Sequence, residues 1–217
     1  MTSPVRRRPT SLDAVSPDSS PPDPSPLDSS PPDPSPPDPS PLDPSPLDTA
    51  PAGPVPVVLA LGSNLGDRAA TLASAVAALS CVPHLVVETV SPVVESDPVG
   101  GPEQGPYLNA VVLARTTSSP AELLRQCQRV EAGHGRERLV RWGARTLDVD
   151  IVCYGALVVD TDALTLPHPR ARDRAFVLVP WALADPSAEL PGPGGGTVGR
   201  LAQAAPDRDG VHSWAAP

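Results

Sequence analysis

The stretch Arg141-Trp142-Gly143-Ala144-Arg145-Thr146-Leu147-Asp148-Val149-Asp150-Ile151 carries the pattern around which the rest of the chain can be ordered. From Thr146 onward, polar and apolar residues alternate, which is the two-residue period of a half-buried strand. Asp148 and Asp150 therefore leave the same face of that strand, about 6.6 Å apart at Cα. Two carboxylates at this spacing suit one or two hard cations such as Mg²⁺.

Four arginines stand near these carboxylates in the sequence, namely Arg136, Arg138, Arg141 and Arg145. Guanidinium groups match phosphate oxygens in geometry and charge, so they could hold a polyphosphate beside the cations. A bare Asp-x-Asp is weak evidence, because a solvated strand face with ordinary surface arginines has the same spacing. The added arginines and the Trp-Gly turn favour phosphoryl-transfer chemistry over that alternative.

Hydrophobic periodicity orders the rest of the chain around this strand. It predicts strands at 56–61, 84–95 and 107–116, a helix that ends near Ser80, and a second helix that follows Ser119. Ser119 and Glu122 form a capping box, with Pro120 at the first helical position. The order β-α-β-β-α-β predicts an α+β, ferredoxin-like fold, with an antiparallel sheet, helices on one face and a C-terminal extension. In that extension we expect a strand at 156–160, an apolar segment at 175–183 that enters the core, and a loop at 191–196.

The N-terminal segment has a different composition from the rest of the chain. Residues 1–54 contain 18 of the 33 prolines and no aromatic residue, and Asp recurs at every fifth position from Asp13 to Asp48. Such a segment cannot bury enough apolar surface to offset its ordering entropy. We therefore predict a disordered, polyproline-II-like tail over 1–54 and one globular domain over 55–217.

Charge, cysteines and hydropathy exclude several classes of protein. The tail carries eight Asp against three Arg, so it accounts for −5 of the net charge of −9 and leaves the domain acidic. A net basic face, as nucleic-acid binding requires, is therefore not expected. No run approaches the length of a membrane span. The separated Cys81, Cys127 and Cys153 are typical of reduced thiols, which together with the absence of a signal-peptide pattern indicates a cytoplasmic protein.

Four ordered motifs carry a resemblance to a known family. They are Ala60-Leu61-Gly62-Ser63-Asn64-Leu65-Gly66-Asp67; Gly101-Pro102-Glu103-Gln104 with Tyr107-Leu108-Asn109-Ala110; the stretch 141–151; and Leu166-Pro167-His168-Pro169 followed by Arg174-Ala175-Phe176-Val177-Leu178. Together they resemble the 6-hydroxymethyl-7,8-dihydropterin pyrophosphokinases of folate biosynthesis, in family order over about 56–185. The tail lies outside the resemblance.

The resemblance implies a reaction. The β,γ-pyrophosphoryl unit of ATP would pass to the hydroxymethyl oxygen of the pterin, which gives AMP and the pterin diphosphate. Asp148 and Asp150 would hold two Mg²⁺ ions, and Arg136 and Arg145 would act with them in catalysis. This agrees with the residues themselves, because in phosphoryl transfer a protein supplies alignment and charge neutralisation.

The resemblance also implies the ligand contacts. ATP would be bound by Gln128, Glu131, Arg136, Arg138, Arg145, Ile151, His168 and Arg174. The pterin would be bound by Ser96, Val99, Gly100, Tyr107, Asn109, Trp142 and Phe176, with the two rings of Tyr107 and Phe176 stacked on it and Trp142 closing as a lid. Asn64 is expected to be a scaffold for the pterin loop. This chain departs from common family residues at Ser96, Asp97, Ala163 and Pro169.

Two other functions compete with this one. A palm-type nucleotidyl transferase or cyclase can also place paired carboxylates on a ferredoxin-like sheet, and it would release pyrophosphate where the favoured reaction releases AMP. A non-catalytic module that recruits partners through its Pro-x-x-Pro tail is the third hypothesis. The regular Asp of the tail argues against a groove ligand and for a solubilising tail, whose deletion should leave turnover unchanged. The sequence leaves oligomeric state, kinetic order and association with neighbouring folate enzymes open.

Overall fold

A single antiparallel sheet organises the computed structural model, which describes residues 45–100, 104–135 and 146–216. Its strand order is β10-β3-β4-β1-β5, and β2 also pairs with β4. The strands are β1 (Val55–Ser63), β2 (Leu85–Val90), β3 (Val94–Ser96), β4 (Tyr107–Thr116), β5 (Asp148–Tyr154) and β10 (Val211–Ser213). Long β1 and β4 lie at the centre, so β1 runs between β4 and the edge strand β5.

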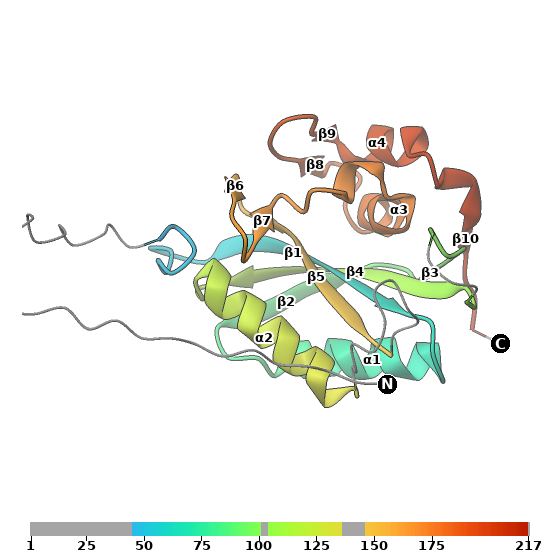
Figure 1. Cartoon of the computed structure of the whole chain (residues 1–217), viewed down its shortest axis with the longest axis horizontal. Coiled ribbons are helices and arrows are strands. Elements are labelled where there is room, and N and C mark those ends of the chain that lie inside the picture. The colour runs from blue at the N-terminus through green and yellow to red at the C-terminus, as the bar shows by residue number, and fades with distance from the viewer. Residues whose placement is uncertain (1–44, 101–103, 136–145, 217) are drawn as a thin grey trace, which may run out of the picture. The chain divides into compact units, whose positions relative to one another are not determined.

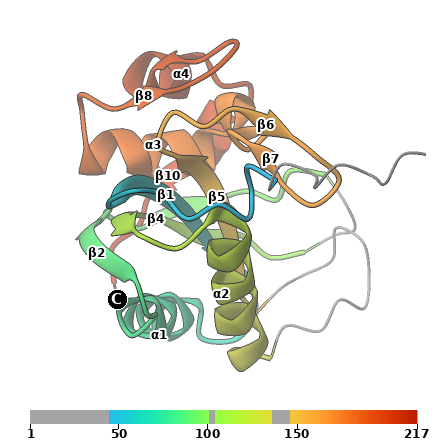
Figure 2. The same ribbon diagram turned by 90° about the vertical axis from the view of Figure 1, so that its left-hand side faces the viewer.

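Helices cover both faces of this sheet (Figures 1 and 2). Helices α1 (Arg68–Ser80) and α2 (Pro120–Gly133) lie on one face, whereas α3 (Ala175–Ala184) and α4 (Val198–Ala204) lie on the other. The core order β1-α1-β2/β3-β4-α2-β5 confirms the predicted ferredoxin-like pattern, with its two helices on one face. The C-terminal extension supplies the second helical layer.

Each face of the sheet has its own apolar cluster. Toward α1 and α2, Val149 and Ile151 of β5 pack with residues of β1 and α2, such as Leu59, Leu61 and Leu123. Toward α3 and α4, the cluster includes Val58, Val111, Leu178 and Trp181. Because Val149 and Ile151 enter the first cluster, strand alternation turns Asp148 and Asp150 to the α3 side.

The predicted start of the second helix is confirmed, and the structure adds the cap of the first. Asp67 caps α1 by accepting from the Ala70 N–H at 3.0 Å, and Ser119 caps α2 by accepting from the Glu122 N–H at 3.3 Å. A short oxygen acceptor at these positions satisfies backbone donors that the helix itself leaves unpaired. The Ser119 cap thus lets α2 begin directly after the turn that follows β4.

The predicted strand over 84–95 is divided into β2 and β3. Pro92 lacks the N–H that a continuous ladder needs. In its place Ser91 pairs with Val111 twice, through its own N–H and through its hydroxyl oxygen, at 2.9 and 2.8 Å. β4 therefore pairs with β2 over its second half and with β3 over its first residues.

The C-terminal extension is more regular than the sequence suggested. The strand expected at 156–160 is the two-residue β6 (Val159–Asp160), paired with β7 (Thr165–Leu166). The apolar segment 175–183 is helix α3, and the glycine-rich loop connects β8 (Glu189–Leu190) to β9 (Gly196–Thr197). None of the helices described here has the length and apolar character needed to cross a bilayer.

The segment just before β1 is part of the folded unit. The compact unit that contains the sheet begins at Asp43, and Leu47 within it is only 6% exposed. The Leu47 carbonyl accepts from the N–H of Ala121 at 2.9 Å, which satisfies a second donor at the start of α2. Residues 45–54 thus differ from the tail expected there. The disorder expected for 1–44 lies outside the described residues and stays a prediction.

Truncating Leu47 should therefore lower stability without changing the chemistry. For Leu47→Ala we expect the free energy of unfolding to fall by about 2 kcal/mol, as for a buried leucine. In a domain of this size that loss lowers the Tm by about 4–8 °C. Thermal unfolding of the purified variant measures the effect. Deletion of residues 1–44 is the matched control and should leave Tm and turnover unchanged; an equal loss in both proteins would contradict a specific anchor at Leu47.

Candidate active site

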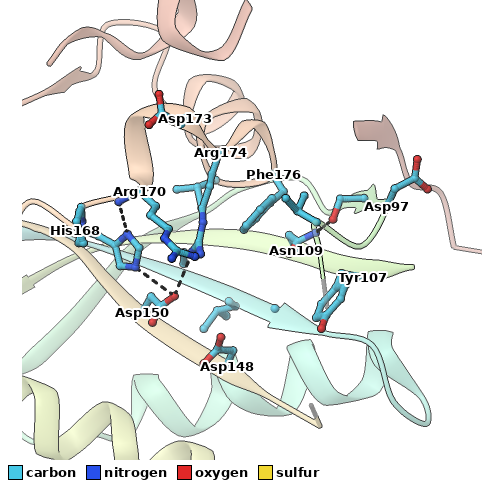
Figure 3. A pocket seen from close by; sticks show the side chains of 18 of the residues that line it. Asp97, Tyr107, Asn109, Asp148, Asp150, His168, Arg170, Asp173, Arg174 and Phe176 are labelled. Carbon is cyan, nitrogen blue, oxygen red and sulfur yellow. Dashed lines mark hydrogen bonds and ion pairs between the residues drawn. The ribbon is translucent and has the colours of Figure 1, made fainter. Parts of the chain in front are cut away.

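A cavity of about 650 Å³ lies between the sheet and α3 (Figure 3). Its floor comes from β1, β3, β4 and β5, and its opposite wall comes from residues 168–177, which include the 3₁₀ helix η1 (Ala171–Asp173) and the start of α3. A volume of this size is typical of sites for small ligands. The side chains divide it into a charged end over β5 and an aromatic and amide end over β4.

Strand register fixes the charged end. Asp148 and Asp150 of β5 stand opposite Gly62 and Ala60 of β1. Both aspartates line the cavity, as the two-residue period predicted. The Asp150 Oδ2 lies 3.8 Å from His168 Nε2 and 3.9 Å from Arg174 Nη1. One carboxylate oxygen is therefore flanked by an imidazole and a guanidinium from the opposite wall (Figure 3).

His168 has a defined tautomer. Its Nδ1 accepts from the backbone N–H of Arg170 at 3.2 Å, so in the neutral ring the proton is on Nε2, which faces Asp150. Burial lowers the pKa of His168 to about 4, and the nearby Arg174 charge acts in the same direction. At neutral pH the ring is therefore an uncharged N–H donor aimed at the charged end of the cavity.

Arg174 connects the two ends of the cavity. Its guanidinium carbon lies 5.3 Å from the centroid of the Phe176 ring, within the range of a cation–π contact. Burial lowers the pKa of Arg174, while the charge of Asp150 opposes that shift. The group stays cationic at neutral pH. A fixed cation thus stands next to Asp150 on one side and an aromatic face on the other.

The other end of the cavity presents a buried amide above a bare strand. Asn109 donates from Nδ2 to Ser96 Oγ at 2.9 Å, and both side chains are buried. Gly62 stands opposite Asn109 in the register, and a Cβ at Gly62 would lie 3.3 Å from the Asn109 Oδ1. The missing side chain at Gly62 therefore leaves room for a flat group between the amide and the carboxylates.

A short hydrogen-bond network orients Tyr107. Its hydroxyl donates to Gln104 Oε1 at 3.0 Å, and Asn64 Nδ2 donates to the same oxygen at 3.1 Å. Asn64 is 8% exposed and follows directly after β1. In Figure 3, Asn109 lies between Phe176, which comes from the start of α3, and Tyr107, whose hydroxyl points away from Phe176. The geometry supports the expected scaffold role of Asn64 and gives Gln104 a role the sequence had not assigned.

Comparison with known proteins shows which family the chain belongs to. The model of the 7,8-dihydro-6-hydroxymethylpterin-pyrophosphokinase family (HPPK) matches residues 58–186. The chain belongs to the HPPK family. A 2-amino-4-hydroxy-6-hydroxymethyldihydropteridine pyrophosphokinase of Mycobacterium tuberculosis (strain CDC 1551 / Oshkosh) is 49% identical over 144 residues, which are 62% of this chain and 74% of the relative. The enzyme of that name from Bacillus subtilis (strain 168) is 40% identical over 156 residues, 72% of this chain and 88% of the relative.

Solved structures agree on the fold. Wild-type HPPK-DHPS of Plasmodium falciparum with pterin and p-hydroxybenzoate matches with a TM-score of 0.55 at 12% identity, over 73% of this chain. The match covers 46% of the neighbour, so this HPPK-family chain spans less than half the length of that protein. At this identity the likeness supports the ferredoxin-like fold alone.

Most of the site residues predicted from the HPPK resemblance meet in the cavity. They are Ser96, Val99, Gly100, Tyr107, Asn109, Asp148, Asp150, His168, Arg174 and Phe176. Gln128, Glu131 and Ile151 are described but do not line it: Gln128 is exposed on α2, and Glu131 and Ile151 are buried. Arg136, Arg138, Arg145 and Trp142 lie outside the described residues.

The sequence missed four polar residues of the cavity, namely Asp97, Gln104, Arg170 and Asp173. Gln104 ends the Gly-Pro-Glu-Gln motif, which was the available signal for it. Arg170 and Asp173 belong to the segment 168–174, which also contains Arg172 and Arg174, and the sequence offered no means of ranking one of these charged residues above another.

The donor set fits Mg²⁺ held partly by the substrate. Across residues 45–100, 104–135 and 146–216, no group of three His, Cys, Asp or Glu side chains could enclose a metal ion. Two carboxylates remain, which is the number Mg²⁺ uses when phosphates and water complete its octahedron. Asp148 and Asp150 are therefore the residues of this HPPK-family chain that would hold such ions.

Proposed function

We propose that this chain transfers the pyrophosphoryl group of ATP to the hydroxymethyl oxygen of 6-hydroxymethyl-7,8-dihydropterin. The products are AMP and the pterin diphosphate, a step of folate biosynthesis. The observation that carries the proposal is one cavity in which paired carboxylates and an amide with two aromatic rings lie on either side of Gly62. Family membership and the names of the relatives support it.

At the charged end, this chain binds the nucleotide phosphates. Asp148 and Asp150 would hold two Mg²⁺ ions, which would neutralise phosphate charge and help to align the attacking hydroxyl. Arg174 and the His168 Nε2–H face the same place and bind phosphate oxygens. Arg136, Arg138 and Arg145 add cations, with Arg136 and Arg145 acting in catalysis, as the sequence predicts.

At the other end, this chain binds the pterin. Tyr107 and Phe176 stack on the two faces of the ring, and Asn109 forms hydrogen bonds with its edge. Ser96, Val99 and Gly100 contribute contacts from the strand and loop beside β4, and Trp142 closes over the site. The nucleotide also lies near Gln128, Glu131 and Ile151.

An assay for AMP tests the proposal. The purified full chain is mixed with Mg²⁺, ATP and 6-hydroxymethyl-7,8-dihydropterin, and AMP is separated from ADP and pyrophosphate. AMP that forms only when both pterin and Mg²⁺ are present is the expected result. Release of pyrophosphate in place of AMP would overturn the proposal in favour of the palm-type nucleotidyl transferase. Folded protein that binds ATP and forms no AMP would also overturn it.

The proposed partners are the two small substrates. The Plasmodium neighbours are named HPPK-DHPS, so there the matching region is joined to a further one in one chain. Association of this chain with other folate enzymes stays a prediction. A cytoplasmic setting is proposed from its three cysteines, all of which are free thiols.

A further inference from the structure

The strand that carries both metal-binding carboxylates lies at the edge of the sheet. β5 pairs only with β1 among the strands that the structure describes. In an antiparallel pair, N–H groups along a strand alternate between pointing at the partner and pointing away. Alternate N–H groups of β5 are therefore directed out of the sheet, where nothing in the ladder can accept from them.

Glu131 of α2 fills this position between the two carboxylates. Its Oε1 accepts from the backbone N–H of Val149 at 2.8 Å, in a buried contact. Because the Val149 N–H points away from β1, those of Asp148 and Asp150 point toward it, in keeping with their register opposite Gly62 and Ala60. The backbone between the aspartates is thus held from both sides.

The carboxyl group of Glu131 is buried and therefore needs hydrogen-bond partners inside the protein. The residue is 4% exposed, and an ionised carboxylate is stable in such surroundings only when donors compensate its charge. Its helix packs against the same strand, since Leu123, Cys127 and Val130 share an apolar cluster with Val149 and Ile151. Glu131 therefore links α2 to the segment Asp148–Asp150.

We propose that Glu131 is a positioning residue, whose carboxylate fixes the backbone of β5 so that Asp148 and Asp150 are preorganised for Mg²⁺. The proposal deepens the proposed function and rests on it for the identity of the metal-binding pair. Glu131 lies outside the cavity lining, so its effect passes through the strand. Groups that orient metal ligands in this way typically change metal affinity by about 10- to 100-fold when they are removed.

Two variants separate the hydrogen bond from the charge. Glu131→Gln keeps an acceptor at Oε1 and removes the charge, whereas Glu131→Met keeps the volume and removes the acceptor. The control is Glu122→Ala on the same helix, because Glu122 bonds Arg125 and Arg129 on the surface and does not contact β5. Circular dichroism and Tm establish that each variant is folded.

The first readout is independent of catalysis. Amide hydrogen exchange at Val149 should accelerate at least about tenfold in Glu131→Met, because a hydrogen bond to a charged group is lost. It should stay within about threefold of wild type in Glu131→Gln and Glu122→Ala. Protection of Val149 that persists in Glu131→Met would overturn the proposal, as would an equal loss of protection in the Gln variant.

The second readout is the metal. Mn²⁺ affinity, measured in the presence of a non-hydrolysable ATP analogue, should fall about tenfold or more in Glu131→Met, with recovery in Glu131→Gln. The Mg²⁺ concentration for half-maximal AMP formation should rise in parallel, while the KM for pterin stays unchanged. Unchanged metal affinity with an unprotected Val149 would overturn the positioning role. Wild-type protein that forms no AMP would defeat the proposed function alone, since exchange and Mn²⁺ binding are measured without turnover.

Discussion

Replacement of Asp150 by asparagine should lower the kcat for AMP formation by about 10³-fold or more. Metal ions contribute several kcal/mol of charge stabilisation to such a transition state, and each 1.4 kcal/mol is about a factor of ten. The amide of the variant would keep the shape of the Asp150 side chain and lose the charge that faces His168 and Arg174 at 3.8 and 3.9 Å. Steady-state AMP formation at saturating ATP, pterin and Mg²⁺ gives the number.

The matched control for Asp150→Asn is Asp162→Asn. Asp162 is exposed in the turn after β6 and lies away from the cavity lining. Its variant should have wild-type turnover. The fold of Asp150→Asn should persist, with pterin affinity within about threefold of wild type, because the amide of Asn109, which we propose binds the pterin, lies two strands away on β4. Turnover above about a tenth of wild type would contradict the role of Asp150 in metal binding.

Arg174→Ala should lower kcat/KM for both substrates by about 10²- to 10³-fold, as for loss of one preorganised charged donor. The guanidinium is half-buried beside Asp150 and over the Phe176 ring, so its loss affects the phosphate end and the aromatic end together. Measured separately, the KM values for ATP and pterin should both rise. A change confined to one of them would show that Arg174 does not bridge the two ends.

Two further variants define what Arg174 contributes. Arg174→Lys keeps the charge but loses the planar fork that binds phosphate and stacks on a ring, so it should recover only part of the loss. Arg172→Ala is the control, because Arg172 is largely exposed, contacts Asp173 at 3.5 Å and does not line the cavity. Full activity in Arg174→Lys would mean that charge alone is required.

Local sequence signals were sufficient for the core of the fold. The alternation from Thr146 predicted β5 and the common face of its two carboxylates, and the capping box at Ser119 predicted the start of α2. The structure of the C-terminal extension was harder to predict. β10 has only three residues and forms because β3 offers a free edge, a condition that the sequence near Val211 does not contain. The break at Pro92 follows from a local signal, the missing N–H of proline, whereas the pairing of Ser91 with Val111 across the sheet does not.

The candidate site shows the same division between local and long-range information. Motif matches predicted the side chains that face the cavity, such as Asn109, Asp150 and Phe176. They could not predict why these side chains are held in place. Gln104 is joined to Asn64 forty positions away, and Glu131 reaches Val149 from another element. Contacts of this kind depend on the packed structure, which periodicity and spacing do not encode.

The register of β1 determines how long an inhibitor of this site must be and how the site would respond to a residue inserted in β1. Gly62 is aligned with Asn109 on one neighbour and with Asp148 on the other. Adjacent strands lie about 4.8 Å apart, so the strand register holds the backbones of Asn109 and Asp148 about 10 Å apart. An inhibitor that contacts both residues must span that length. Because backbone hydrogen bonds set this distance, side-chain substitutions change it little. A one-residue insertion in β1 would shift the register with both β4 and β5.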